Sequence, residues 1–362
     1  MKKLIYAIIA VAVAGIFFFA GLYVHSLQQP VTVYKETEEK IIKVRELDKY
    51  LADGWYDERV VRIYSQSGEN MLVKESEIAA KGEEWGQEPF VKMYSTLGEE
   101  VYAPQSQIEE YKAVGWYEKR PDWEGLSDLK EQIEGVVSSS WGVFVQNLDT
   151  NEFLVINEKP FVSASIVKLY TMATTYAQIE AGTVEKTDEV MENLRSMITV
   201  SSNEACNYLT RINGGGKDLV GYDRENELSK SLGCENTVRG SYIVDESRRR
   251  GSYRTQNKTS PRDCGRLLKA IYNKELVSEA ASEEMLSLLL DQQRVWKIPA
   301  ALPEGTKIAN KTGETNNVNS DVAIVFSEGA DYILCMLGNG SKAPGVGTIH
   351  TVSKMVYDYF NQ

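Results

Sequence analysis

Ser165 and Lys168 are the first pair of residues in this chain whose types and spacing suggest chemistry. The apolar residues around them predict the start of a helix, where one turn brings the lysine amine beside the serine hydroxyl. A helix N-terminus presents free N–H groups and partial positive charge, which stabilise an oxyanion. A buried lysine can lose its proton near neutral pH and then accept one from a serine. The pair therefore predicts a nucleophile and its base, although S-x-x-K alone is common by chance.

A second pair, Ser201 and Asn203, follows a stretch with helical periodicity at residues 193–200. Two residues apart on a loop, their side chains can face one cleft, where the hydroxyl relays a proton to a leaving group. The amide can hold a substrate carbonyl or the lysine. The alternative interpretation is a helix cap that is followed by Glu204.

The third motif is Lys311-Thr312-Gly313, within a stretch from Lys307 that predicts an edge strand. The lysine and the threonine would hold a substrate anion. The glycine would let a substrate backbone approach the strand, and the N–H of Glu314 would be a second oxyanion donor.

Composition argues against several other chemistries. Two histidines are too few to favour a Ser-His-Asp triad or a zinc site built on histidines. The four cysteines form no C-x-x-C pair, and we interpret them as small buried residues, with two disulfides as the alternative. A net charge of −12 argues against nucleic acid as a partner, and we expect no metal and no cofactor. The two histidines are His25 and His350, and the four cysteines are Cys206, Cys234, Cys264 and Cys335.

The elements around the motifs are expected in the order helix, two strands, a helical middle, three strands and helix. Alternating apolar residues predict the strands, and a turn at residues 148–151 joins the first two in a hairpin. This order suits an α+β fold in which helices from both ends of the chain cover one antiparallel sheet. The expected helices are 126–136 and 351–360, and the expected strands are 141–147, 152–157, 307–313, 321–326 and 331–336.

In this order and on these elements, the three motifs resemble those of the penicillin-recognising serine hydrolases, which include class A β-lactamases and D-alanyl-D-alanine peptidases. The resemblance covers about residues 126–362. It implies an α/β sandwich with a five-stranded antiparallel sheet flanked by helices. It also implies a role for each motif residue: Ser165 is the acylated nucleophile, Lys168 its activator, Ser201 the proton relay, Asn203 a ligand of substrate and lysine, and Lys311 and Thr312 the contacts to the substrate carboxylate.

The sequence departs from class A β-lactamases at the loop where they carry a glutamate, in an E-x-x-L-N pattern, that activates water for deacylation. This loop should precede Asn257. Residues 242–251 occupy that place in this sequence, and they contain no Leu-Asn pair. Asp245 and Glu246 are the candidate deacylation bases. The alternative interpretation of an Asp-Glu pair before an arginine run is a solvated loop.

A second departure concerns the substrate carboxylate. No arginine follows Arg294, so the strands after the third motif cannot supply the arginine that many β-lactamases use to bind that group. Glu314 adds a negative charge beside the motif. Arg248, Arg249 and Arg250 would compensate only if their loop folds inward. Both points weaken the prediction of tight binding to an anionic β-lactam.

Residues 60–120 repeat themselves: the stretch 61–65 recurs thirty residues later as 91–95, and a tryptophan beside a glycine closes each unit. We expect small β-β-α modules that stack on their neighbours, with Ser76 and Ser106 as helix N-caps. The interpretation that we favour is a spacer. The alternative is contact with the cell wall or with a partner protein.

An uncharged apolar run, Leu4 to Val24, follows two lysines at the N-terminus. Such a run spans roughly 30 Å of hydrocarbon, and the preceding lysines favour a cytoplasmic N-terminus. We therefore expect a single-pass signal-anchor at residues 1–26, followed outside the cytoplasm by a stalk at 27–121 and a catalytic domain at 126–362. Cleavage as a signal peptide is the alternative.

These observations predict an extracytoplasmic, membrane-anchored serine hydrolase that forms an acyl-enzyme at Ser165. Its expected substrates are β-lactams or the amide bonds of cell-wall peptides. Alternatives on the same fold are an esterase or amidase with another substrate, and a sensor or binding protein that acylates slowly. The missing glutamate pattern argues against efficient antibiotic hydrolysis.

Overall fold

The computed structural model describes residues 22–35, 37–95, 99–243 and 254–362. The chain divides into two compact units, Met1–Pro121 and Asp122–Gln362, which we call the N-terminal and C-terminal units. All three sequence motifs lie in the C-terminal unit.

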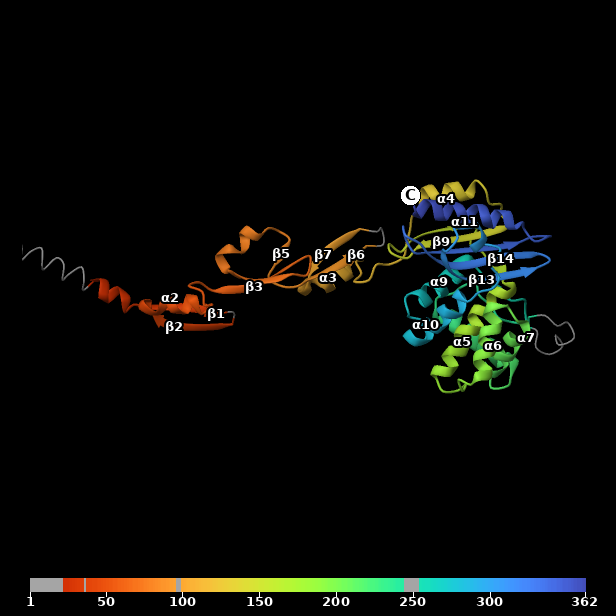
Figure 1. The fold of residues 1–362 in the computed structure, drawn as a ribbon, viewed down its shortest axis with the longest axis horizontal. Helices are drawn as coiled ribbons and strands as arrows, with labels where there is room; N and C mark the ends of the chain where they lie inside the picture. Colours follow the sequence, from red (N-terminus) through yellow and green to blue (C-terminus); the bar gives the residue numbers. More distant parts are fainter. Residues whose placement is uncertain (1–21, 36, 96–98, 244–253) are drawn as a thin grey trace, which may run out of the picture. The chain divides into compact units, whose positions relative to one another are not determined.

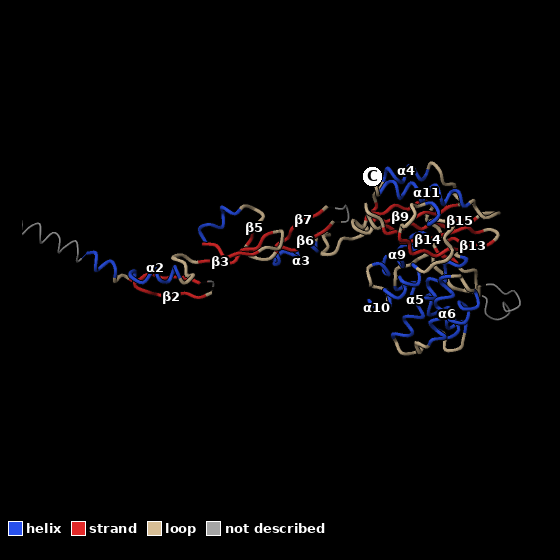
Figure 2. Tube along the Cα trace, in the orientation of Figure 1, coloured by secondary structure: helices blue, strands red, loops and turns tan. Residues whose placement is uncertain are grey.

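The C-terminal unit contains one mixed sheet between two layers of helices (Figures 1 and 2). The strand order is β13-β14-β15-β9-β10-β8, and every pair is antiparallel except β10 with β8. The α+β fold is as expected, but the expected count of five strands is wrong because β8 adds a sixth. Two residues are too few to give a recognisable strand pattern. The strands are β8 (Trp123–Glu124), β9 (Trp141–Asn147), β10 (Glu152–Ile156), β13 (Lys307–Thr315), β14 (Val318–Phe326) and β15 (Tyr332–Asn339).

The two faces of the sheet pack into two separate cores. Successive side chains of a strand point to opposite faces, so Val143 and Val145 of β9 join one core while Phe144 joins the other. The first core is closed by α4 and α11, which lie side by side over the sheet in Figure 1. Because helices cover both faces, the strands are apolar on both faces and almost wholly buried. The helices of this unit are α4 (Ser127–Glu134), α5 (Lys168–Glu180), α6 (Asp188–Thr199), α7 (Asn203–Asn213), α8 (Asp218–Ser231), α9 (Pro261–Tyr272), α10 (Glu279–Leu290) and α11 (Val346–Phe360).

A short two-stranded sheet leads into the first motif. In it β11 (Phe161–Val162) pairs with β12 (Lys258–Thr259), so the chain before Ser165 is tied to the chain before α9. The 3-10 helix η4 (Ala164–Val167) then joins directly to α5. The sheet edge at β13 lies against η4, which brings the first and third motifs together.

The N-terminal unit consists of hairpins that are each followed by a short helical segment. In the second and third modules, the N–H and Oγ of Ser76 bond to Glu58, and those of Ser106 bond to Glu88 in the same way. The expectation that both serines cap helices is wrong, because each serine lies inside a 3-10 segment and its hydroxyl serves the link to that glutamate. The elements are β1 (Pro30–Lys35), β2 (Glu38–Lys43), η1 (Val44–Glu46), α2 (Leu47–Ala52), β3 (Val60–Ser65), β4 (Asn70–Lys74), η2 (Glu75–Lys81), β5 (Trp85–Gly86), β6 (Phe90–Tyr94), β7 (Glu100–Pro104), η3 (Gln105–Gln107) and α3 (Ile108–Ala113).

The expected membrane span, Leu4 to Val24, lies almost entirely outside the described residues. Across the ranges that the structure describes, no helix has the length and apolar character that a membrane crossing requires.

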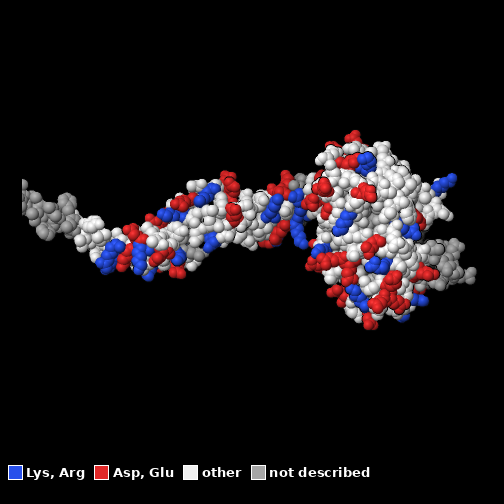
Figure 3. Space-filling view, in the orientation of Figure 1, with Lys and Arg blue, Asp and Glu red and all other residues white. Residues whose placement is uncertain are grey.

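Acidic and basic side chains are interspersed over the face of each unit that Figure 3 shows.

Candidate active site

Ser165 lies in η4, and Lys168 is the first residue of α5. Their spacing places Lys168 Nζ 3.1 Å from Ser165 Oγ. The preceding residue, Ala164, has a φ of 44°, a left-handed conformation that costs energy for a residue with a side chain. The turn that presents Ser165 is therefore a strained one.

Lys168 is completely buried and lies among oxygen atoms. Besides Ser165, its Nζ donates to Ser201 O at 2.6 Å, to Ser201 Oγ at 3.0 Å and to Asn203 Oδ1 at 2.7 Å. The pKa of Lys168 is lowered to about 8, mainly by burial; the nearby Cys206 opposes this shift, and Arg294 and Arg239 add to it. A lysine with such a pKa exists partly as the free amine near neutral pH, as a base must.

Ser201 lies between two lysines. Its Oγ is 3.0 Å from Lys168 Nζ and 2.9 Å from Lys311 Nζ. Burial, followed by the charge of Lys168, lowers the pKa of Lys311 well below its ordinary value. The Ser201 hydroxyl therefore accepts a hydrogen bond from each lysine, and either amine is close enough to exchange a proton with it.

The alternative interpretation, a helix cap followed by Glu204, holds for the residue between the two motif residues and not for Ser201. The N-cap of α7 is Ser202, whose side chain accepts from Ala205 N. Ser201 instead has a φ of 64°, a left-handed conformation at the tip of the loop. Asn203 then begins α7 and turns its side chain back toward Lys168.

Position 313 needs a glycine for a structural reason that the sequence did not reveal. A Cβ at this position would lie 2.9 Å from Ile166 Cγ1 and 3.0 Å from Ser163 O. The glycine thus allows β13 to approach the turn that carries Ser165. Its expected use, the approach of a substrate backbone, stays a prediction.

Glu314 does not stand as a free negative charge beside the third motif. Its Oε1 lies 3.0 Å from Lys297 Nζ, and its Oε2 lies 3.6 Å from Arg294 Nη1. Both cations come from the segment that precedes β13. The charge that Glu314 adds beside the third motif is thus opposed by two cations, and its expected effect on an anionic substrate stays a prediction. No motif in the sequence points to this pairing.

The candidate deacylation bases Asp245 and Glu246 lie outside the described residues, as do Arg248, Arg249 and Arg250. Among the residues that the structure describes, no carboxylate forms a hydrogen bond with Ser165 or Lys168.

The loop that leads to these residues is attached to α7. Asn207 Nδ2 donates to Ile243 O at 3.2 Å, and Ile243 N donates to Asn207 Oδ1 at 3.1 Å. Asn207 lies one helical turn beyond Asn203 and so on the same face of α7. The described residue that α7 holds at this point, Ile243, is apolar and buried.

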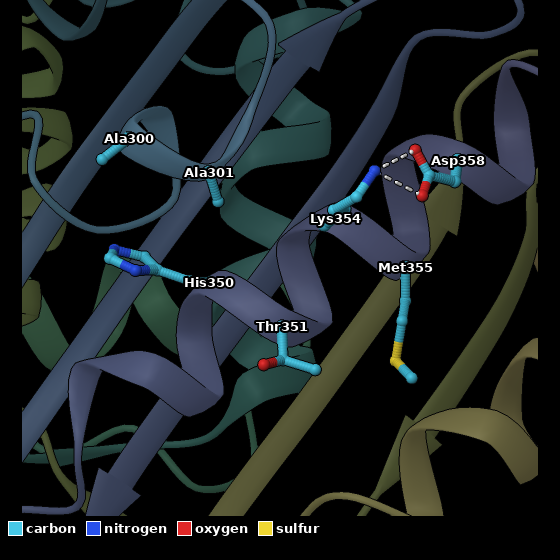
Figure 4. Close-up of a pocket in the computed structure, with 7 residues that line it drawn as sticks. All are labelled: Ala300, Ala301, His350, Thr351, Lys354, Met355 and Asp358. Carbon is cyan, nitrogen blue, oxygen red and sulfur yellow. Dashed lines mark hydrogen bonds and ion pairs between the residues drawn. The ribbon is translucent and has the colours of Figure 1, made fainter.

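A hollow on α11 shares no residue with the Ser165 site (Figure 4). Its volume is about 550 Å³, and an ion pair between Lys354 and Asp358 crosses its wall.

Within the described ranges, no group of three or more histidine, cysteine, aspartate or glutamate side chains could hold a metal ion. The four cysteines are buried and free.

Comparison with known proteins gives a consistent result. The model of the β-lactamase enzyme family (Beta-lactamase2) matches residues 128–193 and 189–360. No curated protein matches the sequence.

Several solved structures are similar to the C-terminal unit. The structure of PBP-A has a TM-score of 0.57 and 26% identity over 67% of this chain and 98% of that chain. An acyl-enzyme complex of a PBP-A mutant with penicillin G gives the same values. A β-lactamase from Sphaerobacter thermophilus has a TM-score of 0.55 and 19% identity over 66% of this chain and 98% of that chain, which shows the fold alone.

Proposed function

Because this chain belongs to the β-lactamase enzyme family and is a serine hydrolase, we propose that Ser165 is acylated by β-lactams or by the amide bonds of cell-wall peptides. The resemblance on which the sequence prediction depended is thereby confirmed. The observation that carries the proposal is the unbroken series of contacts from Ser165 through Lys168 and Ser201 to Lys311, at 3.1, 3.0 and 2.9 Å.

In the proposed acylation, Lys168 as the free amine takes the proton of the Ser165 hydroxyl while Oγ attacks the carbonyl carbon. The backbone N–H groups of Ser165 and Glu314 stabilise the oxyanion that forms. The carbon–nitrogen bond then breaks, and Ser201 gives its hydroxyl proton to the leaving nitrogen. Ser201 regains a proton from Lys168, which returns that lysine to the free amine and leaves an ester on Ser165.

Release of the acyl group is proposed to be slow. Hydrolysis of the ester needs a base that activates water, and no described carboxylate forms a hydrogen bond with Ser165 or Lys168. Asp245 and Glu246 remain the proposed bases if release is fast. Slow release would favour a second function, that of a sensor or binding protein that responds to the acylated state.

The remaining parts of the chain are proposed to place this domain outside the cell. Residues 1–26 would form a single-pass anchor, which the uncharged run from Leu4 to Val24 supports. The modules of residues 27–121 would act as a spacer. Contact with the cell wall through these modules is the alternative.

Labelling of the full-length protein with a fluorescent penicillin tests this proposal. We expect a covalent adduct on Ser165 and none on the variant Ser165→Ala, with the labelled protein in the membrane fraction. Intact-mass spectrometry over hours then follows the ester, and rapid nitrocefin turnover would contradict slow release. Equal behaviour of the wild type and Ser165→Ala toward penicillin and a fluorophosphonate would end the proposal.

A further inference from the structure

A buried ion pair lies among the helices that carry Lys168 and Asn203. The side chains of Glu225 in α8 and of Arg239 are 0% and 1% exposed, and Arg239 Nε lies 3.2 Å from Glu225 Oε2. The side chain of Asn226 accepts a hydrogen bond from the backbone N–H of Arg239 at 2.7 Å and donates one to its carbonyl at 2.9 Å. The arginine is therefore held beside its carboxylate partner by the neighbouring residue of the same helix.

Glu225 ties the helix of Lys168 to the helix of Asn203. Its Oε2 accepts a hydrogen bond from Thr171 Oγ1 of α5 at 2.9 Å, and its Oε1 accepts one from Thr210 Oγ1 of α7 at 2.7 Å. Thr171 lies one helical turn after Lys168 and so on the same face of α5. One carboxylate therefore fixes the separation of two helices across which Lys168 Nζ donates to Asn203 Oδ1 at 2.7 Å.

Arg239 extends this network toward Lys168 through Cys206. Its Nη2 donates to Cys206 Sγ at 3.7 Å and to Thr210 Oγ1 at 3.2 Å, and Cys206 Sγ lies 3.6 Å from Thr171 Oγ1. Because the Thr171 hydroxyl already donates to the carboxylate, the thiol is the donor in that last contact. Burial lowers the pKa of Lys168, and the positive charge of Arg239 adds to this effect.

Several other charged or titratable groups face Lys168. Lys311 of β13 contacts the same serine hydroxyl, Cys206 of α7 opposes the effect of burial on the pKa, and Arg294 adds to it. Lys311 belongs to the third motif, and Arg294 pairs with the residue that follows that motif, so both lie where a substrate is expected. A change at Arg239, which is 2% exposed, alters the charge near Lys168 without removing a group that a substrate can reach.

Stability alone is a poor explanation of this ion pair. Replacement of a buried ion pair by packed apolar residues is often neutral or stabilising, because the desolvation of both charges offsets their attraction. Here Nη1 of Arg239 is buried without a hydrogen-bond partner among the described residues, which adds to the cost of burial. The contacts of the pair with α5 and α7 point instead to a role in the candidate active site.

We propose that Glu225 and Arg239 are positioning residues for Lys168: the carboxylate holds α5 and α7 at the separation that the contact with Asn203 needs, and the guanidinium group opposes protonation of the amine. The inference rests on the proposed acylation of Ser165 with Lys168 as its base. Both members of the pair are completely buried, so they act on the reaction through the lysine and not by contact with the substrate.

The test follows acylation of the full-length protein by penicillin G between pH 5.5 and 9.5, measured by intact-mass spectrometry. In the wild type the rate constant should reach half its maximum near pH 8. We expect Arg239→Gln to raise this midpoint by about 0.5–1 in pH, because a positive charge near the amine is lost. Glu225→Gln should lower it by a similar amount, since Arg239 then acts without its counter-charge while the amide can still bond to both threonine hydroxyls.

The matched control is Asp223→Asn, which removes a carboxylate from the same helix, where its partner Arg254 is half-exposed. It should leave the midpoint unchanged. Each single variant leaves one buried charge unpaired, which can prevent folding, so the double variant Glu225→Leu with Arg239→Met removes both charges together. We expect the double variant to fold and to acylate about tenfold more slowly at its plateau, because the tie between α5 and α7 is lost.

Opposite shifts of the midpoint support the proposal, since a merely structural pair would lower stability without moving it. The proposal is overturned if the two single variants shift the midpoint in the same direction or not at all, whatever their stability. If neither single variant folds, the double variant decides, and a plateau equal to that of the wild type overturns the proposal. Failure of penicillin G to acylate the wild type would refute the proposed function itself, and that result is distinct from these.

Discussion

Lys168 is buried among four oxygen atoms, and these surroundings act on its proton in opposite directions. The hydrogen bonds favour the charged ammonium group, whereas burial disfavours it. Burial dominates, and the pKa of Lys168 is about 8 instead of the ordinary 10.5. The free amine therefore forms as the pH rises through about 8.

This pKa predicts how acylation depends on pH. If Lys168 is the base, the rate constant for acylation by penicillin G should rise with pH, pass half its maximum near pH 8 and reach a plateau above about pH 9. At pH 6 it should be about a hundredfold below that plateau, because only about 1% of the lysine is then deprotonated. Stopped-flow or quenched mass measurements between pH 5.5 and 9.5 provide the check.

Lys168→Arg is the control for this profile, since a guanidinium group stays protonated in proteins. We expect it to lose acylation at every pH in the range. A flat profile in the wild type would exclude Lys168 as the titrating base.

Single residues differ in how far sequence could predict them. The motif residues Ser165, Lys168, Ser201 and Lys311 were predictable as a set because their order and spacing are unusual, and the structure brings all four together. Their catalytic roles stay predictions. Arg294 was not predictable as a neighbour of Glu314, because that contact depends on the path of residues 292–298 between two layers.

At the scale of elements, the close contact between β13 and η4 sets the distance between the nucleophile and the opposite wall. The glycine at position 313 allows this contact, since the nearest atoms to a Cβ there belong to Ile166 and Ser163. These two residues flank Ser165. A shift of β13 away from η4 would therefore move the third motif relative to the nucleophile.

Gly313→Ala tests this coupling. We expect a loss of about 1–3 kcal/mol in the free energy of unfolding from overpacking. We also expect acylation to slow by about ten- to hundredfold, because small displacements of reacting groups are costly. Gly345→Ala is the matched control, since a Cβ there meets no atom within 4 Å and the backbone is not left-handed. A fully active Gly313→Ala would show that the close contact is dispensable.

Element boundaries show why sequence reasoning succeeded for some segments and failed for others. The hairpin at β9 and β10 and the three strands β13, β14 and β15 have long apolar stretches, which fix their positions along the chain. β8 could not be recognised because a strand of two residues has no alternating pattern in the sequence. Ser76 and Ser106 fit the pattern of a cap, but Glu58 and Glu88, 18 residues away, compete for their hydroxyls.

At the scale of the whole molecule, the C-terminal unit begins at Asp122, four residues before the start that helical spacing suggests. The four residues from Asp122 to Gly125 are bound to the hairpin of β9 and β10. Asp122 accepts a hydrogen bond from Gln146 at 2.7 Å and forms an ion pair with Lys269. Trp123 Nε1 donates to Thr150 O at 3.2 Å, and Gly125 N donates to Phe153 O at 2.8 Å.

These contacts predict that a chain of residues 122–362 is more stable than one of residues 126–362. Removal of residues 122–125 exposes one edge of β10 and leaves Gln146, which is 1% exposed, without its carboxylate partner. A loss of about 2–3 kcal/mol follows from a few hydrogen bonds of about 1 kcal/mol each. For a unit of this size, that loss corresponds to a fall of about 5–10 °C in Tm.

Thermal unfolding followed by circular dichroism measures this difference, and the chain of residues 118–362 is the control, because its four extra residues belong to the other unit. That chain should melt together with 122–362. Acylation by penicillin G well below the melting temperature should be the same for all three chains, because the described side chains that form hydrogen bonds with Lys168 all lie beyond position 164. Equal Tm values for 122–362 and 126–362 would mean that β8 adds a strand to the sheet without stabilising it. Slower acylation of 122–362 than of the full-length protein would show that the repeat modules act on the catalytic unit as more than a spacer.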